Sequence, residues 1–346
     1  MRPMSDLRTV EWVNGHVRMV DQTQLPNRLV YVNLKNYRQV SRAISVMIVR
    51  GAPAIGVAAA MGMALAGQAN RNKGRHRILK ELEVAAESLR ASRPTAQNLF
   101  WAVNRILQRA HNASPDEDVA KLVVEEAGRM AEEDVQANLS IGRYGAELIA
   151  DGDQVLTHCN TGTLATVNYG TALAPIRTAV RQGKRVRVVA TETRPRLQGA
   201  KLTTYELMSD RIPVTLIVDG AAGYVIRRGM VQKVIVGADR ITRGLVANKV
   251  GTYLIALAAQ ASSVPFYVAA PASTFDLRRD GSEPKIEERD GKEVTFINGK
   301  RIPPRGVPVF NPAFDLTPVE LVKGFITEKG VFTPEVLVTQ PALIQA

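Results

Sequence analysis

The stretch VQKVIVGAD, residues 231–239, shows the pattern that decides the fold: a short β-branched run that ends in glycine, alanine and an acid. Similar runs recur through the second half of the chain, and each is followed by a turn and a helix-like segment. This alternation is typical of βα units, in which helices cover both faces of a parallel sheet. A doubly wound domain is therefore predicted. The runs are Val155 to Thr157, Val186 to Ala190, Val214 to Val218, Val231 to Val236 and Val264 to Val268.

The first 137 residues show a different pattern of apolar and polar residues. Two alternating stretches, Thr9 to Val13 and Val17 to Val20, are separated by Asn14-Gly15, which is the strongest short-range pattern for a hairpin. From Val40 onward, apolar residues recur with helical spacing. We expect an α/β protein with a small mixed, mainly helical N-terminal domain over residues 1–137 and the doubly wound domain over residues 138–346. The charged and then Pro-rich residues 280–313 are expected to form an ordered excursion and not a linker.

Composition excludes several classes of protein. One cysteine among 346 residues cannot form an intramolecular disulfide framework or a Cys-x-x-Cys metal site. The four histidines show no His-x-x-x-His spacing, so we expect no protein-supplied metal site. The first residues do not show the basic region followed by an apolar region that is typical of a signal peptide, and the most apolar stretch, Ala52 to Gly67, looks too short to span a bilayer. The expectation is a soluble cytoplasmic protein that does not associate with a membrane.

The net charge raises the question of a nucleic-acid partner. A formal charge of +12 and a pI near 9.9 would suit such a protein. The densest basic runs, residues 71–77 and 181–187, contain no aromatic residues on which bases could stack. We therefore interpret these runs as solvated faces and expect no nucleic-acid partner; an anionic small substrate is a weaker explanation of the charge.

Two residues with proton-transfer chemistry follow strand-like runs. Cys159 lies between a strand end and a glycine-containing turn, where a helix start would stabilise its thiolate. Asp239 comes directly from a buried apolar strand, where desolvation would raise the pKa of its carboxyl group. The alternatives are structural: Cys159 as a small buried hydrophobe and Asp239 as a cap for the following turn. In open parallel sheets, ligands bind beyond such strand ends.

Two arginines stand at turn-to-helix junctions. Arg50 precedes Gly51-Ala52-Pro53, and Arg93 precedes Pro94-Thr95-Ala96. An arginine beside a helix N-terminus is a plausible phosphate clamp, although a solvated surface arginine explains each one equally well. The segment TETRPRLQG, residues 191–199, follows another strand and lacks the spacing of a dinucleotide fingerprint; a Walker loop is also absent from the sequence.

Taken together and in this order, six segments resemble the methylthioribose-1-phosphate isomerase family over nearly the whole chain. They are VRGAPAIG from Val49, RPTAQNLFWAV from Arg93, THCNTGTLATVNYGTALAPI from Thr157, ETRPRLQGAKLT from Glu192, VGADRITRGLVANKVGTY from Val236 and NPAFDLTPVELVKGFITEKG from Asn311. The resemblance implies a Rossmann-like C-terminal domain without a dinucleotide site, a homodimer, and cofactor-free conversion of 5-methylthioribose 1-phosphate to 5-methylthioribulose 1-phosphate in methionine salvage.

The same resemblance assigns roles to residues. It implies that Cys159 and Asp239 are the catalytic pair. We hypothesise that the Cys159 thiolate takes the C2 proton while a protonated Asp239 donates to the opening sugar ring. The residues implied to contact the phosphorylated pentose are Arg50, Gly51, Ala52, Arg93, Gln198, Asn248 and Lys249.

Two other functions stay open from the sequence. An isomerase of 5-deoxyribose 1-phosphate or ribose 1,5-bisphosphate would use the same catalytic pair and differ only at the C5 end of the substrate. A non-catalytic protein like the regulatory subunits of the translation initiation nucleotide-exchange factor would share the fold. Such a protein need not retain both Cys159 and Asp239, so their presence favours an enzyme.

Overall fold

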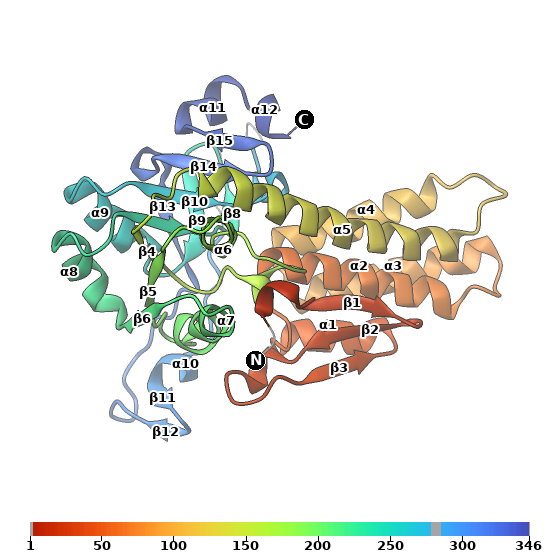
Figure 1. The fold of residues 1–346 in the computed structure, drawn as a ribbon. Coiled ribbons are helices and arrows are strands. Elements are labelled where there is room, and N and C mark those ends of the chain that lie inside the picture. Colours follow the sequence, from red (N-terminus) through yellow and green to blue (C-terminus); the bar gives the residue numbers. More distant parts are fainter. Residues whose placement is uncertain (1–2, 278–284, 346) are drawn as a thin grey trace.

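The computed structural model describes residues 3–277 and 285–345, and its N-terminal part begins with an antiparallel hairpin (Figure 1). The hairpin turns at Asn14 and Gly15, whose φ angles of 47° and 81° are the left-handed values that the predicted Asn-Gly turn requires. A third strand completes this small sheet, and five helices follow. The elements are β1 (Val10–Val13), β2 (His16–Val20), β3 (Tyr31–Leu34), α1 (Tyr37–Ser45), α2 (Ala52–Ala69), α3 (Arg75–Ser92), α4 (Gln97–His111) and α5 (Val119–Ala146).

Helix α2 forms the centre of the N-terminal core, because every residue from Ala54 to Gly67 is buried. Its small residues let neighbouring helices approach closely: a Cβ added to Gly56 would lie 3.0 Å from the carbonyl oxygen of Asn98 in α4. By length and composition alone α2 could cross a membrane, so the expectation that this stretch is too short was wrong. However, 78% of α2 is buried inside the protein, and packing in the core accounts for its apolar surface.

A seven-stranded sheet dominates the second part of the molecule. Six of its strands are parallel in the order β6-β5-β4-β7-β10-β14, and β15 pairs antiparallel at one edge. This is the strand order of Rossmann folds, in which the order reverses between the first and fourth parallel strands, here β4 and β7. The predicted doubly wound sheet is confirmed. Its strands are β4 (Gln154–Thr157), β5 (Arg187–Thr191), β6 (Val214–Ile217), β7 (Lys233–Val236), β10 (Phe266–Ala269), β14 (Gly324–Thr327) and β15 (Gly330–Phe332).

Helices cover both faces of this sheet, because successive side chains of a strand point to opposite sides. Val155 of β4 packs with residues of α5 and α6 on one face, whereas Leu156 packs with residues of α8 and α9 on the other. The strands therefore read as continuous apolar runs. The helices that connect the strands are α6 (Leu173–Arg181), α7 (Thr204–Ser209), α8 (Ala222–Arg227) and α9 (Thr252–Ala261).

A second, three-stranded antiparallel sheet in the order β13-β9-β8 stands beyond the end of β7. It brings residues after 313 next to residues 245–249. The predicted excursion contains a short helix and a two-stranded hairpin within residues 285–313, and its residues 280–284 lie outside the described part. The remaining elements are β8 (Arg240–Ile241), β9 (Leu245–Lys249), α10 (Lys292–Thr295), β11 (Phe296–Ile297), β12 (Lys300–Arg301), β13 (Phe314–Pro318), α11 (Pro334–Thr339) and α12 (Ala342–Gln345).

Helix α5 connects the two parts of the molecule without interruption (Figure 1). Val123 and Met130 belong to the N-terminal core, whereas Ile141 and Ala146 belong to the core on one face of the large sheet. The domain boundary expected between residues 137 and 138 falls inside this helix. The division into two domains therefore stays a prediction.

Candidate active site

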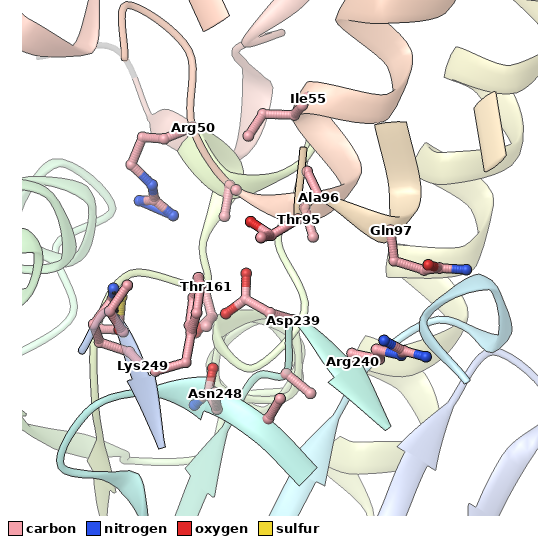
Figure 2. Close-up of a pocket in the computed structure, with 18 of the residues that line it drawn as sticks. Arg50, Ile55, Thr95, Ala96, Gln97, Thr161, Asp239, Arg240, Asn248 and Lys249 are labelled. Atoms are coloured by element: carbon pink, nitrogen blue, oxygen red, sulfur yellow. Dashed lines mark hydrogen bonds between the residues drawn. The ribbon is translucent and has the colours of Figure 1, made fainter. Parts of the chain in front are cut away.

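A cavity of about 130 Å³ lies where the carboxyl ends of β4 and β7 meet the starts of α2 and α4. Because the strand order reverses between β4 and β7, this is the position at which open α/β sheets bind ligands. Figure 2 shows Arg50 and Ile55 entering from the helical part, with Asp239, Asn248 and Lys249 on the side of the sheet. All predicted site residues line this one cavity: Arg50, Gly51, Ala52, Arg93, Cys159, Gln198, Asp239, Asn248 and Lys249.

Cys159 is placed by the loop that follows β4. Its backbone has a left-handed φ of 63°, its N–H donates to Thr193 Oγ1 at 2.9 Å, and its carbonyl accepts from Thr203 Oγ1 at 2.6 Å. The expected helix start beside the thiol was wrong: only a 3₁₀ turn, Thr163–Ala165, follows, and α6 begins at Leu173. Helix-dipole stabilisation of a thiolate is therefore absent from this loop.

The charge of Cys159 is controlled by burial and by neighbouring side chains. Burial raises the pKa of the thiol, and the Asp239 carboxylate raises it further. Arg50 and Lys249 act in the opposite direction, because their positive charges favour the thiolate. Two cations thus take the place of the helix dipole that the sequence predicted.

His158 fixes the backbone on which Cys159 sits. The ring is buried; its Nε2 donates to the Val250 carbonyl at 2.9 Å, which leaves Nδ1 to accept from Thr191 Oγ1 at 2.6 Å. Burial lowers the pKa of this histidine, so the neutral tautomer fits both bonds. The ring therefore joins the ends of β4 and β5 to the turn that follows Lys249.

Asp239 follows β7 and faces the cavity. Its N–H donates to the Ala247 carbonyl at 2.9 Å. Its carboxylate makes no hydrogen bond or ion pair with any residue in the described part of the chain, and α9 begins only at Thr252, so Asp239 is not a cap. Burial raises the pKa of this carboxyl group, while Lys249, Arg93 and Arg50 partly oppose the shift. A buried acid without a fixed partner is suited to proton transfer.

The start of α2 supplies backbone donors to the same cavity. Gly51 has a φ of 99°, and a Cβ at this position would lie 2.3 Å from the Ala165 carbonyl oxygen, so only glycine fits. Ala52 opens the helix, and Arg50 precedes Gly51, the N-cap residue. Free N–H groups at the N-terminus of a long helix, beside an arginine, form a good environment for a phosphate group.

The remaining predicted residues lie around this point. Arg93 Nη2 is 3.1 Å from Glu287 Oε2, and Asn248 Nδ2 donates to Thr252 Oγ1 at 3.0 Å. Lys249 Nζ donates to the Ala313 carbonyl at 2.6 Å and lies 4.5 Å from the centre of the Phe314 ring. Burial lowers the pKa of Lys249. The cavity is therefore cationic on one wall and acidic at Asp239.

Sequence reasoning missed Arg196, Arg289 and Phe314, which also line the cavity. Arg196 stands two residues before Gln198 in a segment already singled out, so its position after β5 could have identified it. Arg289 and Phe314 come from the excursion and from β13, which reach the site only through tertiary pairing. Within residues 3–277 and 285–345, no three His, Cys, Asp or Glu side chains are grouped as a metal site would require.

Comparison with known proteins places this chain among relatives of similar length. The model of the Initiation factor 2 subunit family matches residues 48–334. The chain is 51% identical to the methylthioribose-1-phosphate isomerase of Thermosipho africanus, over 94% of this chain and 95% of that protein. Among solved structures, 5-methylthioribose 1-phosphate isomerase from Pyrococcus horikoshii OT3 superposes with a TM-score of 0.91 at 43% identity, covering 98% of this chain and 96% of that one.

A second solved structure carries a different name. The protein described as translation initiation factor eIF-2B, subunit delta, from A. fulgidus has a TM-score of 0.88 at 47% identity and covers 99% of this chain and 100% of its own. Both names occur within one family, which agrees with the resemblance found in the sequence. The chain belongs to the Initiation factor 2 subunit family and, within it, to the methylthioribose-1-phosphate isomerases.

Proposed function

We propose that this protein is an aldose–ketose isomerase that converts 5-methylthioribose 1-phosphate to 5-methylthioribulose 1-phosphate in methionine salvage. The observation that carries the proposal is the pairing of Cys159 and Asp239 in one buried cavity with Arg50 and Lys249. The names of the relatives support this choice of substrate. The N-terminus of α2, Arg50 and Arg93 would bind the phosphate group, because backbone donors and guanidinium groups complement its charge.

The chemistry of this substrate requires an acid and a base. Phosphate blocks the anomeric oxygen, so the ring cannot open as a free hemiacetal does. In the proposed route, protonated Asp239 donates its proton to the ring oxygen as the C1–O bond breaks, and the Cys159 thiolate removes the C2 proton to give an enol. The Cys159 thiol then returns a proton to C1 while the Asp239 carboxylate accepts the proton of the C2 hydroxyl, which leaves the ketone.

A hydride shift from C2 to C1 is the alternative route, and it also needs an acid at the ring oxygen. The two routes differ in the fate of the hydrogen at C2. Proton transfer through Cys159 would exchange some deuterium from C2 with solvent, whereas a hydride shift would carry all of it to C1. NMR of the product from 2-deuterated substrate distinguishes them.

The experiment that tests the function is turnover by the purified protein in the presence of a chelator. 5-Methylthioribose 1-phosphate is compared with 5-deoxyribose 1-phosphate and ribose 1,5-bisphosphate. Preferred turnover of the methylthio compound, reduced by about 10²-fold or more in Cys159→Ser and Asp239→Asn, supports the proposal, because a proton-transfer group typically contributes that much. Turnover near the wild-type rate in either variant would contradict the mechanism.

The C5 substituent distinguishes the proposed substrate from its rivals. Met47, Ile55 and Phe314 give the cavity an apolar portion that suits a methylthio group. The positive charge of the several arginines in the site would also suit a second phosphate group, so ribose 1,5-bisphosphate is included in the assay. If no sugar phosphate is converted, the regulatory role suggested by the name of the A. fulgidus protein becomes the leading proposal.

We also propose that the protein is a cytoplasmic homodimer. We call the outer surface of α8 and α9 the α8–α9 face; it includes the exposed side chains of Tyr224 in α8 and of Tyr253 and Leu254 in α9, which are 64%, 37% and 69% exposed. The two helices pack together, since a Cβ at Gly223 would lie 3.8 Å from Ala258 Cβ. An exposed apolar face on a sheet-covering layer suits a second copy of the chain.

Nucleic acid is not part of this proposal. In the basic run of residues 71–77, Arg75 donates to the carbonyls of Ala113 and Ser114, and Arg77 pairs with Glu81 at 2.6 Å. These arginines bind the protein's own chain, which supports a role for them in the structure of this surface.

A further inference from the structure

The side chain of Asn160, the residue after Cys159, lies between the carboxylate of Glu206 and the guanidinium group of Arg50. The residue is 2% exposed. Its Nδ2 donates to Glu206 Oε1 at 2.8 Å, and its Oδ1 accepts from Arg50 Nη1 at 2.5 Å. The Asn160 carbonyl accepts from Arg50 Nη2 at 2.7 Å. One residue therefore fixes both terminal nitrogens of the arginine that enters the cavity.

Glu206 holds the side-chain amide of Asn160 in place. It is fully buried, and its charge is balanced by Arg177, whose Nη2 is 2.8 Å from Glu206 Oε2. The carboxylate also accepts the N–H groups of Thr163 and Leu164, at 2.7 and 3.2 Å. A Cβ at Gly162 would lie 2.2 Å from Glu206 Oε2, so the loop rests directly on this carboxylate. With so many fixed partners, Glu206 has little freedom to move.

The chemistry of an amide explains why asparagine occupies this position. A carboxylate can only accept and a guanidinium can only donate, so a neutral group that joins them must do both. The amide holds Arg50 without cancelling its charge: within the described residues, Arg50 forms no ion pair with a carboxylate. Arg93, by contrast, is paired with Glu287.

We propose that Asn160 is a positioning residue of this site: its neutral amide, braced by Glu206, holds the Arg50 guanidinium at the cavity wall with its positive charge free for an anionic group. The role of the site as an isomerase centre rests on the proposed function. The position and charge of Arg50 do not, and they can be measured separately.

The thiol of Cys159 reports on Arg50. Burial raises the pKa of this thiol. Arg50 and Lys249 favour the thiolate, as does the Asn160 backbone N–H, which every Asn160 variant retains, and Asp239 opposes it. If Arg50 loses its anchor and moves away, the thiolate loses one of its two stabilising cations. Because Cys159 is the single cysteine of the chain, alkylation of a thiol reports on this position alone.

The experiment measures the rate of iodoacetamide alkylation against pH for the full-length protein. Asn160→Ala is expected to move the midpoint to higher pH and to slow alkylation at pH 7, in the same direction as Arg50→Met. In the Arg50→Met background, Asn160→Ala should add no further shift, because its effect passes through Arg50. An unchanged midpoint in Asn160→Ala, or the same added shift in both backgrounds, would overturn the proposal.

Two further variants separate positioning from a general loss of structure. Asn70→Ala removes another buried amide, which donates to the Ala66 carbonyl far from the site, and should leave the thiol midpoint unchanged. Asn160→Asp keeps the size of the side chain but brings a carboxylate to Arg50, so the midpoint should again rise; an unchanged midpoint here also overturns the proposal. Failure of the wild type to convert sugar phosphates would reject the proposed function and leave this measurement intact.

Discussion

Cys159 and Asp239 cannot be assigned protonation states independently, since burial and then the Asp239 carboxylate raise the pKa of the thiol. A thiolate with a neutral acid and a thiol with a carboxylate contain the same number of protons. The two forms therefore share one pH profile, and turnover reports only the apparent pKa values of the pair. Direct titration of the thiol is more informative than the pH dependence of catalysis.

Asp239→Asn is predicted to move the alkylation midpoint of Cys159 to lower pH. The substitution keeps the shape of the side chain and removes the negative charge that raises the pKa of the thiol. The matched variant Lys249→Met should move the midpoint to higher pH, because it removes a cation. Iodoacetamide alkylation between pH 6 and 10 checks both directions, and a shift of the same sign in both variants would contradict the assignment.

Most residues of the site could be predicted from the sequence, but the secondary structure around them could not. Cys159, Asp239 and Arg50 could be found because each stands at a strand end or a helix start. The stabilising helix beside Cys159 was expected from Gly162 and the residues after it, but the chain makes a single turn there instead. Arg289 reaches the site from a segment with no regular pattern, so no rule of spacing could have placed it.

At the scale of elements, Asp134 on α5 anchors the loop that follows Cys159. Its Oδ2 accepts from the Val167 N–H at 2.7 Å and from Asn138 Nδ2 at 3.0 Å. Burial raises the pKa of Asp134 to about 7, above the value near 4 of an unfolded chain. Between these values the folded chain holds a proton that the unfolded chain has released, so this group lowers stability as the pH rises.

Asp134→Asn should remove this pH dependence. Relative to the variant, the wild type is expected to lose about 1–2 kcal/mol between pH 5 and pH 8, less than full linkage because the residue is only partly shielded from solvent. Urea unfolding of both proteins at the two pH values measures the difference. Asp315, whose pKa burial raises to about 6, contributes equally to both proteins and cancels. Equal pH dependence in the two proteins would disprove the prediction.

The link between α6 and α7 depends on a buried arginine that pairs with two carboxylates. Arg177 is 2% exposed and pairs with Glu206, which is fully buried, and with Asp210. Arg177→Met should destabilise the protein by about 3–5 kcal/mol, because it leaves the two carboxylates without their shared counter-charge. Arg177→Met with Glu206→Gln should cost less than the sum of the single changes. Denaturant unfolding measures these values; Arg185→Met, which breaks an exposed pair with Asp151, is the control and should change little.

Five strands of the large sheet, β4, β5, β6, β7 and β10, could be predicted because their sequences are short β-branched, apolar runs. Strands β14 and β15, which follow the Pro-rich residues, were not among the predicted runs. The small sheet of β8, β9 and β13 could not be predicted. Strand β8 has two residues, and β9 ends in the polar pair Asn248-Lys249, so neither segment shows the pattern on which a strand was predicted. Pairing with β13, about 65 residues away, turns this segment into a strand, and local patterns do not report such distant partners.

At the scale of the whole molecule, the α8–α9 face is predicted to hold two copies together. Leu254→Lys should yield a monomer, because it places a charge in an apolar contact. Sedimentation velocity or light scattering coupled to size exclusion measures the mass. Val338→Lys is the control, since Val338 is 60% exposed on α11, a helix that lies apart from α8 and α9 (Figure 1). A wild-type monomer, or a Leu254→Lys dimer, would reject the α8–α9 face as the interface.

Helix α5 restricts how the two parts of the molecule can move relative to each other. Its 28 residues span about 42 Å at 1.5 Å per residue, and its two ends belong to different cores. Rotation of one part against the other would have to bend this helix, since no loop between them can act as a hinge. We therefore expect the cavity between the two parts to change its width through the loops that line it, with little change in the distance between the start of α2 and the end of β7.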